Sequence, residues 1–264
     1  MITGCQAMMQ LNRLFSLAAI GALTCAVSMP VRADLPQTLV KVKPSIVGVG
    51  SVLPTRNPAR IFYGTGFVVG DGLTVITNVH VVPKILQTEN LEKLVVISGD
   101  ARNPVMREAK AIALDPEHDI AVLRLTGEPL PALTLGDSNT VREGSTVAFT
   151  GFPLGMLLGL YPATHRGVVA AITPYVVPSA NSYQLEVKTI KRLGRPFNVF
   201  QLDAIAYPGN SGSPMYDPET GVVYGVLNSV FVKESKENLL KQPSGISYVI
   251  PSNHIRELLA RPPQ

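Results

Sequence analysis

The sequence has no tryptophan, and its only two cysteines, Cys5 and Cys25, lie near its start. Charged residues make up 16% and aromatic residues 6% of its 264 residues, while 46% are hydrophobic and 22 each are glycine and proline. This composition excludes a disordered tail and a long coiled coil. The remainder of the chain has no cysteine, so packing of a hydrophobic core must stabilise it without disulfides.

The chain also lacks a strong excess of either charge. Arg13 and Arg32 are two of its 23 basic residues, and none of its 19 acidic residues precedes Asp34, which leaves 21 basic against 19 acidic residues. Such a balance predicts no nucleic-acid partner.

The first 33 residues resemble an export signal. Arg13 precedes an apolar run of about 14 residues, 14–27, and the small-residue site Val31–Ala33 follows. A bilayer-spanning helix needs roughly 20 apolar residues, so residues 1–33 are predicted to be a signal peptide cleaved after Ala33. The protein is then periplasmic or secreted and has no stable membrane anchor. An uncleaved anchor and lipidation at Cys25 are the alternatives.

Residues 34–264 are predicted to be β-rich, because short apolar runs are broken every 8 to 12 residues by Gly, Pro, Asn or Asp. Asp71-Gly72 indicates a tight turn, and the segment 127–139 is expected to join two halves of roughly six strands each. The predicted strands are Ser45–Ser51, Gly66–Val69, Leu73–Thr77, Leu94–Ser98, Ile120–Leu125, Thr146–Thr150, Gly167–Ile172, Val222–Ser229 and Ile246–Ile250.

Two short helices complete the prediction. One covers Leu35–Lys43 and the other His254–Ala260, with Ser252 or Asn253 as its cap. Residues 53–62 and 174–196 are expected to form long loops, and no internal repeat is visible in the sequence.

One glycine-rich motif carries the elements of serine chemistry. In Gly209–Pro214, glycines flank Ser211 and allow a sharp turn that points successive N–H groups into one concavity. A serine hydroxyl needs a histidine base, an acid that orients the base, and donors for the oxyanion. We expect the N–H groups of Gly209 and Ser211 to be those donors, although an ordinary surface turn would have a similar sequence.

A histidine and an aspartate upstream could complete the site. His80 follows the second strand of the Asp-Gly hairpin, and Asp119 directly precedes the apolar strand Ile120–Leu125. Separately, they read as a half-buried core histidine and a strand-start turn residue. Together with Ser211, in a β-rich exported chain, they predict a His-Asp-Ser triad.

These motifs resemble the trypsin-like serine proteases, and within them the bacterial HtrA (Deg) branch. The resembling segments, spread from about Pro44 to Leu258, are Gly64–Val69, Thr77–Val82, His118–Val122, Leu135–Ser138, Asp203–Pro214 and Ile250–Asn253. The resemblance implies an all-β fold of two six-stranded antiparallel β-barrels, about 44–127 and 140–250, with a C-terminal helix in 252–264. His80, Asp119 and Ser211 match the base, the orienting acid and the nucleophile of the family.

The sequence departs from the family in three ways. Ser213 stands where a second glycine is usual, no PDZ domain follows Ile250, and no aromatic trimer-forming segment precedes the first strand. We therefore expect a monomer without PDZ-dependent activation.

The expected substrate pocket lies before the nucleophile and along two strands, with Ile205, Asn228 and Ser247 as its predicted walls. Ile205 stands where trypsin has an aspartate, which favours a small or apolar side chain before the scissile bond over Arg or Lys. The apolar run 155–161 is either core between the barrels or a lid near the site.

We predict a serine endopeptidase that acts on polypeptides. The resemblance suggests unfolded proteins as its substrates and a role in protein quality control. The alternative is a protease-fold binding or holdase module with a latent site that needs an activator. An α/β-hydrolase is disfavoured by the order His, Asp, Ser. The four histidines have no paired ligand spacing, so no metal is expected, no phosphate loop or other cofactor site is visible, and His118 is expected at the surface.

Overall fold

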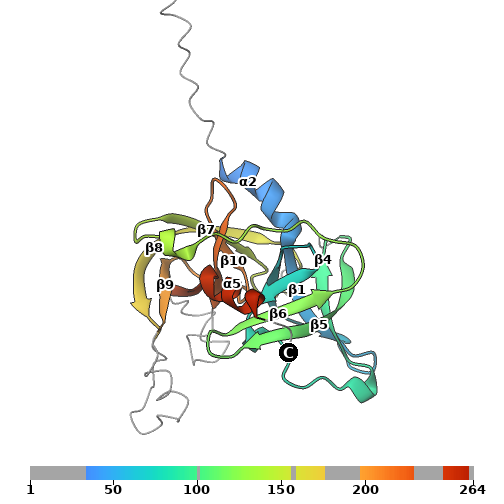
Figure 1. Cartoon of the computed structure of the whole chain (residues 1–264). Coiled ribbons are helices and arrows are strands. Elements are labelled where there is room, and N and C mark those ends of the chain that lie inside the picture. The colour runs from blue at the N-terminus through green and yellow to red at the C-terminus, as the bar shows by residue number, and fades with distance from the viewer. Residues whose placement is uncertain (1–33, 100–101, 156–158, 176–196, 229–245, 262–264) are drawn as a thin grey trace, which may run out of the picture. The chain divides into compact units, whose positions relative to one another are not determined.

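The computed structural model describes residues 34–99, 102–155, 159–175, 197–228 and 246–261 (Figure 1). The predicted signal peptide and most of the predicted 174–196 loop lie outside these residues. Among the described helices, none combines the length and apolar character needed to cross a bilayer.

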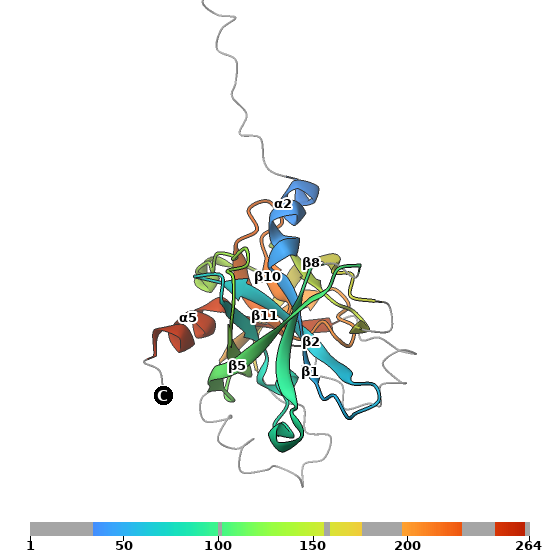
Figure 2. The same ribbon diagram turned by 90° about the vertical axis from the view of Figure 1, so that its right-hand side faces the viewer.

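Two closed antiparallel barrels of six strands each form the fold, which confirms the predicted fold class (Figures 1 and 2). The first barrel has the order β1-β2-β3-β6-β5-β4 and the second the order β10-β11-β12-β9-β8-β7. Each barrel therefore repeats the same strand order. The first consists of β1 (Ile46–Val52), β2 (Arg60–Val69), β3 (Thr74–Thr77), β4 (Lys93–Ser98), β5 (Val105–Asp115) and β6 (Ile120–Leu125).

The second barrel follows a connection that contains the short 3-10 helix η4 (Ser138–Thr140). Its strands are β7 (Thr146–Gly151), β8 (Ala163–Pro174), β9 (Asn198–Asp203), β10 (Pro214–Tyr216), β11 (Val223–Asn228) and β12 (Ile246–Pro251). The sequence did not predict β5, β9 and β10, and β2 begins inside the expected loop 53–62.

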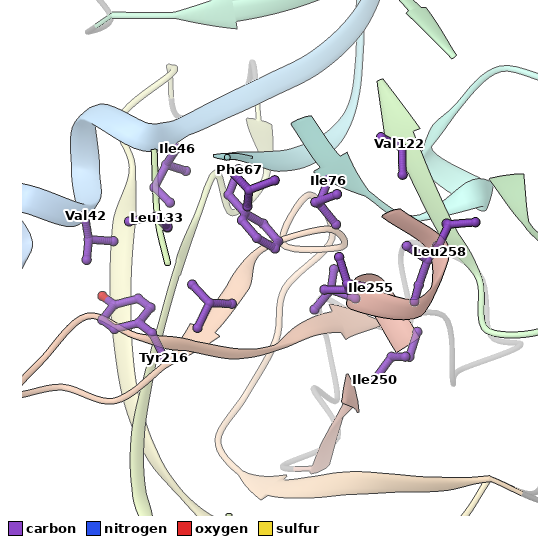
Figure 3. Packing of buried hydrophobic residues seen from close by; sticks show 14 of the residues in the cluster. Val42, Ile46, Phe67, Ile76, Val122, Leu133, Tyr216, Ile250, Ile255 and Leu258 are labelled. Atoms are coloured by element: carbon purple, nitrogen blue, oxygen red, sulfur yellow. The ribbon is translucent and has the colours of Figure 1, made fainter. Parts of the chain in front are cut away.

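Alternation along the strands creates three cores. In β2, Val68 points into the first barrel, whereas Phe67 and Val69 face the second barrel. A third cluster, which includes Phe149 and Leu202, fills the second barrel. The cluster between the barrels is continuous with residues of both terminal helices, and Figure 3 shows its side chains.

The helices α2 (Leu35–Val42) and α5 (Ser252–Ala260) confirm both predicted helices. Asp34 caps α2 with its side chain, and 3-10 helix η1 (Lys43–Ser45) leads into β1. The predicted cap of α5 was wrong: the helix begins after Pro251 without a side-chain cap. Ser252 Oγ instead donates to the carbonyl oxygen of Gly136 at 2.8 Å, and Asn253 Nδ2 donates to Asp137 at 2.8 Å, which ties α5 to the connection between the barrels.

Candidate active site

His80 lies in a one-turn 3-10 helix, η2 (Val79–Val81), directly after β3. Asp119 ends the turn between β5 and β6, where its φ of +54° lies in the left-handed region that few residues other than glycine adopt. The carbonyl oxygen of Asp119 accepts two hydrogen bonds, from Val79 N at 3.3 Å and from Asn78 Nδ2 at 3.0 Å. These hydrogen bonds hold the histidine segment against this turn. The backbone thus fixes the two residues before their side chains interact.

The side chains of His80 and Asp119 form a direct pair. His80 Nδ1 lies 2.6 Å from Asp119 Oδ2, and the backbone N–H of His80 donates to Asp119 Oδ1 at 3.0 Å. An ionised carboxylate only accepts hydrogen bonds, so Nδ1 carries the proton and the lone pair of the ring is on Nε2. The ring remains accessible, with 31% of the His80 side chain exposed.

Asn228, at the end of β11, brings the second barrel to the same carboxylate. Its Nδ2 donates to Asp119 Oδ2 at 2.9 Å, so this oxygen accepts from both barrels. The sequence analysis assigned Asn228 to the substrate pocket and did not foresee this contact. The residue type, an amide at a strand end, gave no signal that could identify it.

Ser211 lies on the connection between β9 and β10 and is nearly buried. Its carbonyl oxygen accepts from Thr65 N in β2 at 2.8 Å. A Cβ atom at Gly64 would lie 3.0 Å from Ser211 O and 2.8 Å from Val81 Cγ2, so Ser211 and the neighbour of His80 border the same glycine. The serine connection and the histidine segment therefore meet at β2.

Two glycines of the Ser211 connection need their positive φ angles. At Gly209 φ is +99° and a Cβ would lie 2.3 Å from the carbonyl oxygen of Phe152; at Gly212 φ is +86° and a Cβ would lie 1.9 Å from that of Thr65. No L side chain fits at either position. Hydrogen bonds inside the protein use the N–H groups of Asn210, Gly212 and Ser213.

Thr65 joins the Ser211 connection to both barrels. Its hydroxyl donates to the carbonyl oxygen of Gly209 at 2.7 Å and accepts from Phe152 N at 3.0 Å. Its own carbonyl oxygen accepts from the Thr77 hydroxyl at 2.7 Å. The sequence contained the Gly-Thr-Gly motif but no indication of these partners.

The predicted pocket residues lie on three neighbouring elements. Ile205 is half-buried, two residues after β9, and Ser247 lies on β12, which pairs with β9. The Ser247 hydroxyl donates to the carbonyl oxygen of Ala204 at 2.7 Å and so holds the segment before Ser211. β11, which ends at Asn228, pairs with β12 on its other edge.

His118, next to the acid, is not at the surface as predicted, because only 14% of its side chain is exposed. Its Nδ1 pairs with Asp115 Oδ2 at 2.9 Å, and its ring stacks on that of His254 in α5 with the centroids 3.9 Å apart. Burial raises the pKa of Asp115, but hydrogen bonds from His118 and the charges of His118 and Arg261 outweigh it and lower the pKa overall. Burial and the nearby His118 lower the pKa of His254.

Within the described ranges, no three His, Cys, Asp or Glu side chains are grouped so that they could hold a metal ion.

Comparisons with known proteins identify relatives of this chain. The family model of the trypsin-like peptidase domain matches residues 64–226. The chain is 37% identical over 203 residues to the mitochondrial serine protease HTRA2 of Bos taurus, covering 75% of this chain and 36% of that protein. It is 30% identical over 207 residues to a probable periplasmic serine endoprotease, DegP-like, of Rickettsia prowazekii (strain Madrid E), covering 78% of this chain and 34% of that protein.

Solved structures share the fold. The HtrA-type protease AlgW with tripeptide superposes with a TM-score of 0.60 at 23% identity, over 86% of this chain and 62% of that one. The serine endoprotease from Yersinia pestis superposes with a TM-score of 0.61 at 21% identity, over 87% of this chain and 66% of that one. The chain spans about a third of the length of the two curated relatives. With the family model matching more than half of its residues, the chain belongs to the trypsin-like peptidase family.

Proposed function

We propose that the protein is an exported serine endopeptidase that hydrolyses peptide bonds through His80, Asp119 and Ser211. The observation that carries the proposal is the 2.6 Å pair of His80 Nδ1 and Asp119 Oδ2, beside a serine connection that is hydrogen-bonded to the same barrel. A carboxylate that fixes the tautomer of a half-exposed histidine is the arrangement that serine hydrolysis requires.

In the first half of the reaction, Ser211 Oγ attacks the carbonyl carbon of the scissile peptide bond and His80 Nε2 takes the hydroxyl proton. Asp119 stabilises the imidazolium ion that forms. When the tetrahedral intermediate collapses, the C–N bond breaks and His80 gives its proton to the leaving amine. The product of this half is an acyl-enzyme, an ester of Ser211.

The second half repeats these steps with water. His80 takes a proton from water as the water oxygen attacks the ester carbon, and the C–O bond to Ser211 then breaks while His80 returns a proton to Oγ. In both halves, we assign stabilisation of the oxyanion to the N–H groups of Gly209 and Ser211. The glycine-specific backbone at Gly209, with φ of +99°, supports this assignment.

The substrates are polypeptides, with unfolded proteins as the first class to examine because of the resemblance to HtrA proteases. Ile205, Asn228 and Ser247 are the proposed pocket residues. An uncharged Ile205 offers no counter-charge to Arg or Lys before the scissile bond. The amide of Asn228, held by Asp119, and the hydroxyl of Ser247, held by Ala204, present no free charge either.

Export rests on the first 33 residues, whose apolar run follows Arg13 and precedes a small-residue site. The probable periplasmic assignment of the Rickettsia relative is consistent with it. We propose cleavage after Ala33, a periplasmic or secreted protein, and a monomer.

The test is digestion of unfolded casein and of quenched peptides that differ only in the residue before the scissile bond. The proposal predicts casein cleavage by the exported protein, none by Ser211→Ala, and faster cleavage after Val, Ala or Leu than after Arg. A faster rate after Arg would overturn the pocket assignment. Casein that is bound and protected from aggregation, but never cut, would favour a binding module with a latent site.

A further inference from the structure

The outer face of β4 carries apolar side chains that do not belong to the core of the first barrel. Leu94 and Val96 point into the core of that barrel. Val95 and Ile97 alternate with them and so point outward, yet each is only 7% exposed. Outward-facing side chains of a barrel are buried only where another part of the molecule covers them. Here the covering residues leave a cavity next to Val95 and Ile97.

A cavity of about 170 Å³ lies over Val95 and Ile97. Its other apolar walls include Ile61, Phe62, Met106 and Leu160. Ser51 is a polar lining residue whose hydroxyl already donates to Glu92 at 2.7 Å. An apolar occupant of the cavity therefore does not leave the Ser51 hydroxyl without an acceptor. An apolar cavity of about 150 Å³ accommodates benzene, so this one has room for a single Leu, Ile, Met or Phe side chain.

Phe62 connects the cavity to the Ser211 connection. A Cβ at Gly209 would lie 3.3 Å from Phe62 Cε1, and one at Gly48 would lie 3.2 Å from Phe62 Cε2. A Cβ at Gly155 would lie only 2.3 Å from Phe62 Cδ1. The ring is thus packed among three glycines, and one of them is two residues before the nucleophile. The cavity and the Ser211 connection therefore border the same aromatic ring.

The rim of the cavity is open and carries one cation. Met106 is 39% exposed and its neighbour Val105 is 50% exposed. Arg60 lines the cavity, is exposed, and forms no ion pair with any residue that the structure describes. Nearby Lys93, in contrast, is paired with Glu108 at 2.8 Å. An unpaired guanidinium at an apolar opening favours a carboxylate next to the apolar group that enters.

We infer that this cavity is a second substrate site, which binds one large apolar side chain of the polypeptide a few residues from the scissile bond, next to an acidic residue held by Arg60. The inference rests on the proposed endopeptidase function. The continuity from the cavity through Phe62 to Gly209 argues for the substrate as occupant, and a volume of about 170 Å³ is too small for a long acyl chain.

Two exposed positions on β5 offer a matched test. Met106 borders the cavity, while Ile112, 50% exposed on the same strand, does not line it. Peptides with one Leu-Glu pair moved stepwise through a background of Ala and Gly would be cleaved by the wild type, Met106→Asp and Ile112→Asp. We expect one register to lower KM about tenfold in the wild type and in Ile112→Asp, because the leucine side chain leaves water when it enters the cavity. Met106→Asp should lose this preference while kcat on the all-Ala peptide is retained.

A binding measurement separates this inference from the proposed activity. In the Ser211→Ala variant, the carbon-13-labelled methyl signal of Met106, assigned with Met106→Leu, should shift saturably with the Leu-Glu peptide and not with an Ala-Ala peptide. The signal of Met215, which is fully buried in the second barrel, should stay in place. An unshifted Met106 signal, or equal KM effects in both aspartate variants, would overturn the second site even if casein is cleaved. A shifted signal in a protein that cleaves nothing would support the site and contradict the endopeptidase function.

Discussion

The two barrels share one strand order, but their corresponding connections hold different chemical groups. The connection between the third and fourth strands carries His80 in the first barrel and Ser211 in the second. Hydrogen bonds from Val79 and Asn78 to the carbonyl oxygen of Asp119 fix the histidine. Positive φ angles at Gly209 and Gly212 shape the serine connection. The same fold therefore holds the proposed base in a hydrogen-bonded turn and the proposed nucleophile in a glycine-dependent one.

The contrast also explains where the barrels depend on each other. The first barrel holds His80 and Asp119 within one hydrogen-bonded unit, and Asn228 of the second barrel donates to the same Asp119 carboxylate. In return, the first barrel supplies Thr65, whose backbone and hydroxyl hold the Ser211 connection. Each barrel thus positions a group that belongs to the other.

The largest effect is expected from Asp119→Asn, which breaks the unit in the first barrel. An amide NH₂ in place of Oδ2 would face the ring with a donor and favour the wrong tautomer of His80. We predict a fall in kcat of about four orders of magnitude with the fold retained. Peptide hydrolysis, with circular dichroism as the control for folding, measures it; kcat within tenfold of the wild type would remove Asp119 from its role.

Asn228 tests the contribution of the second barrel to the acid. Asn228→Ala removes a hydrogen bond to a charged group, so kcat should fall by about 10–100-fold. Asn228→Asp should lose more, because it places a second carboxylate beside Asp119. Asn253→Ala is the matched control, since it removes the hydrogen bond that Asn253 Nδ2 donates to a different carboxylate, that of Asp137. Equal kcat in Asn228→Ala and Asn253→Ala would mean that Asn228 is only structural.

Thr65→Val tests the support that the first barrel gives to the serine connection. The change leaves the N–H of Phe152 and the carbonyl oxygen of Gly209 without their partner. We expect the free energy of unfolding to fall by about 1–3 kcal/mol, with lower kcat. Thr140→Val, at an exposed position, should change neither the free energy of unfolding nor kcat. An unchanged unfolding midpoint in Thr65→Val would contradict the idea that Thr65 supports the Ser211 connection.

The smallest effect concerns the pH dependence of stability. Burial lowers the pKa of His254 and of His165 below the ordinary value of 6.5, so the folded protein disfavours their charged forms. The unfolded chain binds more protons below pH 6.5, and the stability that is present above that pH should be lost as the pH falls. Unfolding midpoints measured from pH 7.5 down to 5 check this.

Phenylalanine variants assign the loss to its sources. His254→Phe keeps an aromatic ring against His118 but cannot titrate, so the decline of the midpoint on acidification should become shallower. His165→Phe should act in the same direction, and the double variant more strongly. A steeper decline in His254→Phe would contradict the lowered pKa.

Much of the fold was predictable because its strands are apolar runs bounded by turn residues. β5 was missed because only Ala109 and Asp115 of its eleven residues are buried, so the strand has no clear alternation. β10 has three residues, too few for a pattern. The repeated strand order was also invisible, because it resides in hydrogen-bonded pairing and not in residue identity.

Residues of the proposed site could be identified from the sequence only where the residue type itself suggests a chemical role. His80, Asp119 and Ser211 stood out because base, acid and nucleophile each need a particular side chain. Thr65 and Asn228 act through contacts between residues 144 and 109 positions apart, which no local pattern encodes. The α5 cap failed for the same reason, since Ser252 binds Gly136 rather than its own helix.

We propose that His80 and Asp119 of one barrel activate Ser211 of the other. Labelling of the purified exported protein with a fluorophosphonate, followed by peptide mapping, tests it most directly. We expect one phosphonate per chain, on Ser211, with no labelling in Ser211→Ala and little in His80→Ala. A folded wild-type protein that stays unlabelled, or that is labelled at another serine, would contradict it.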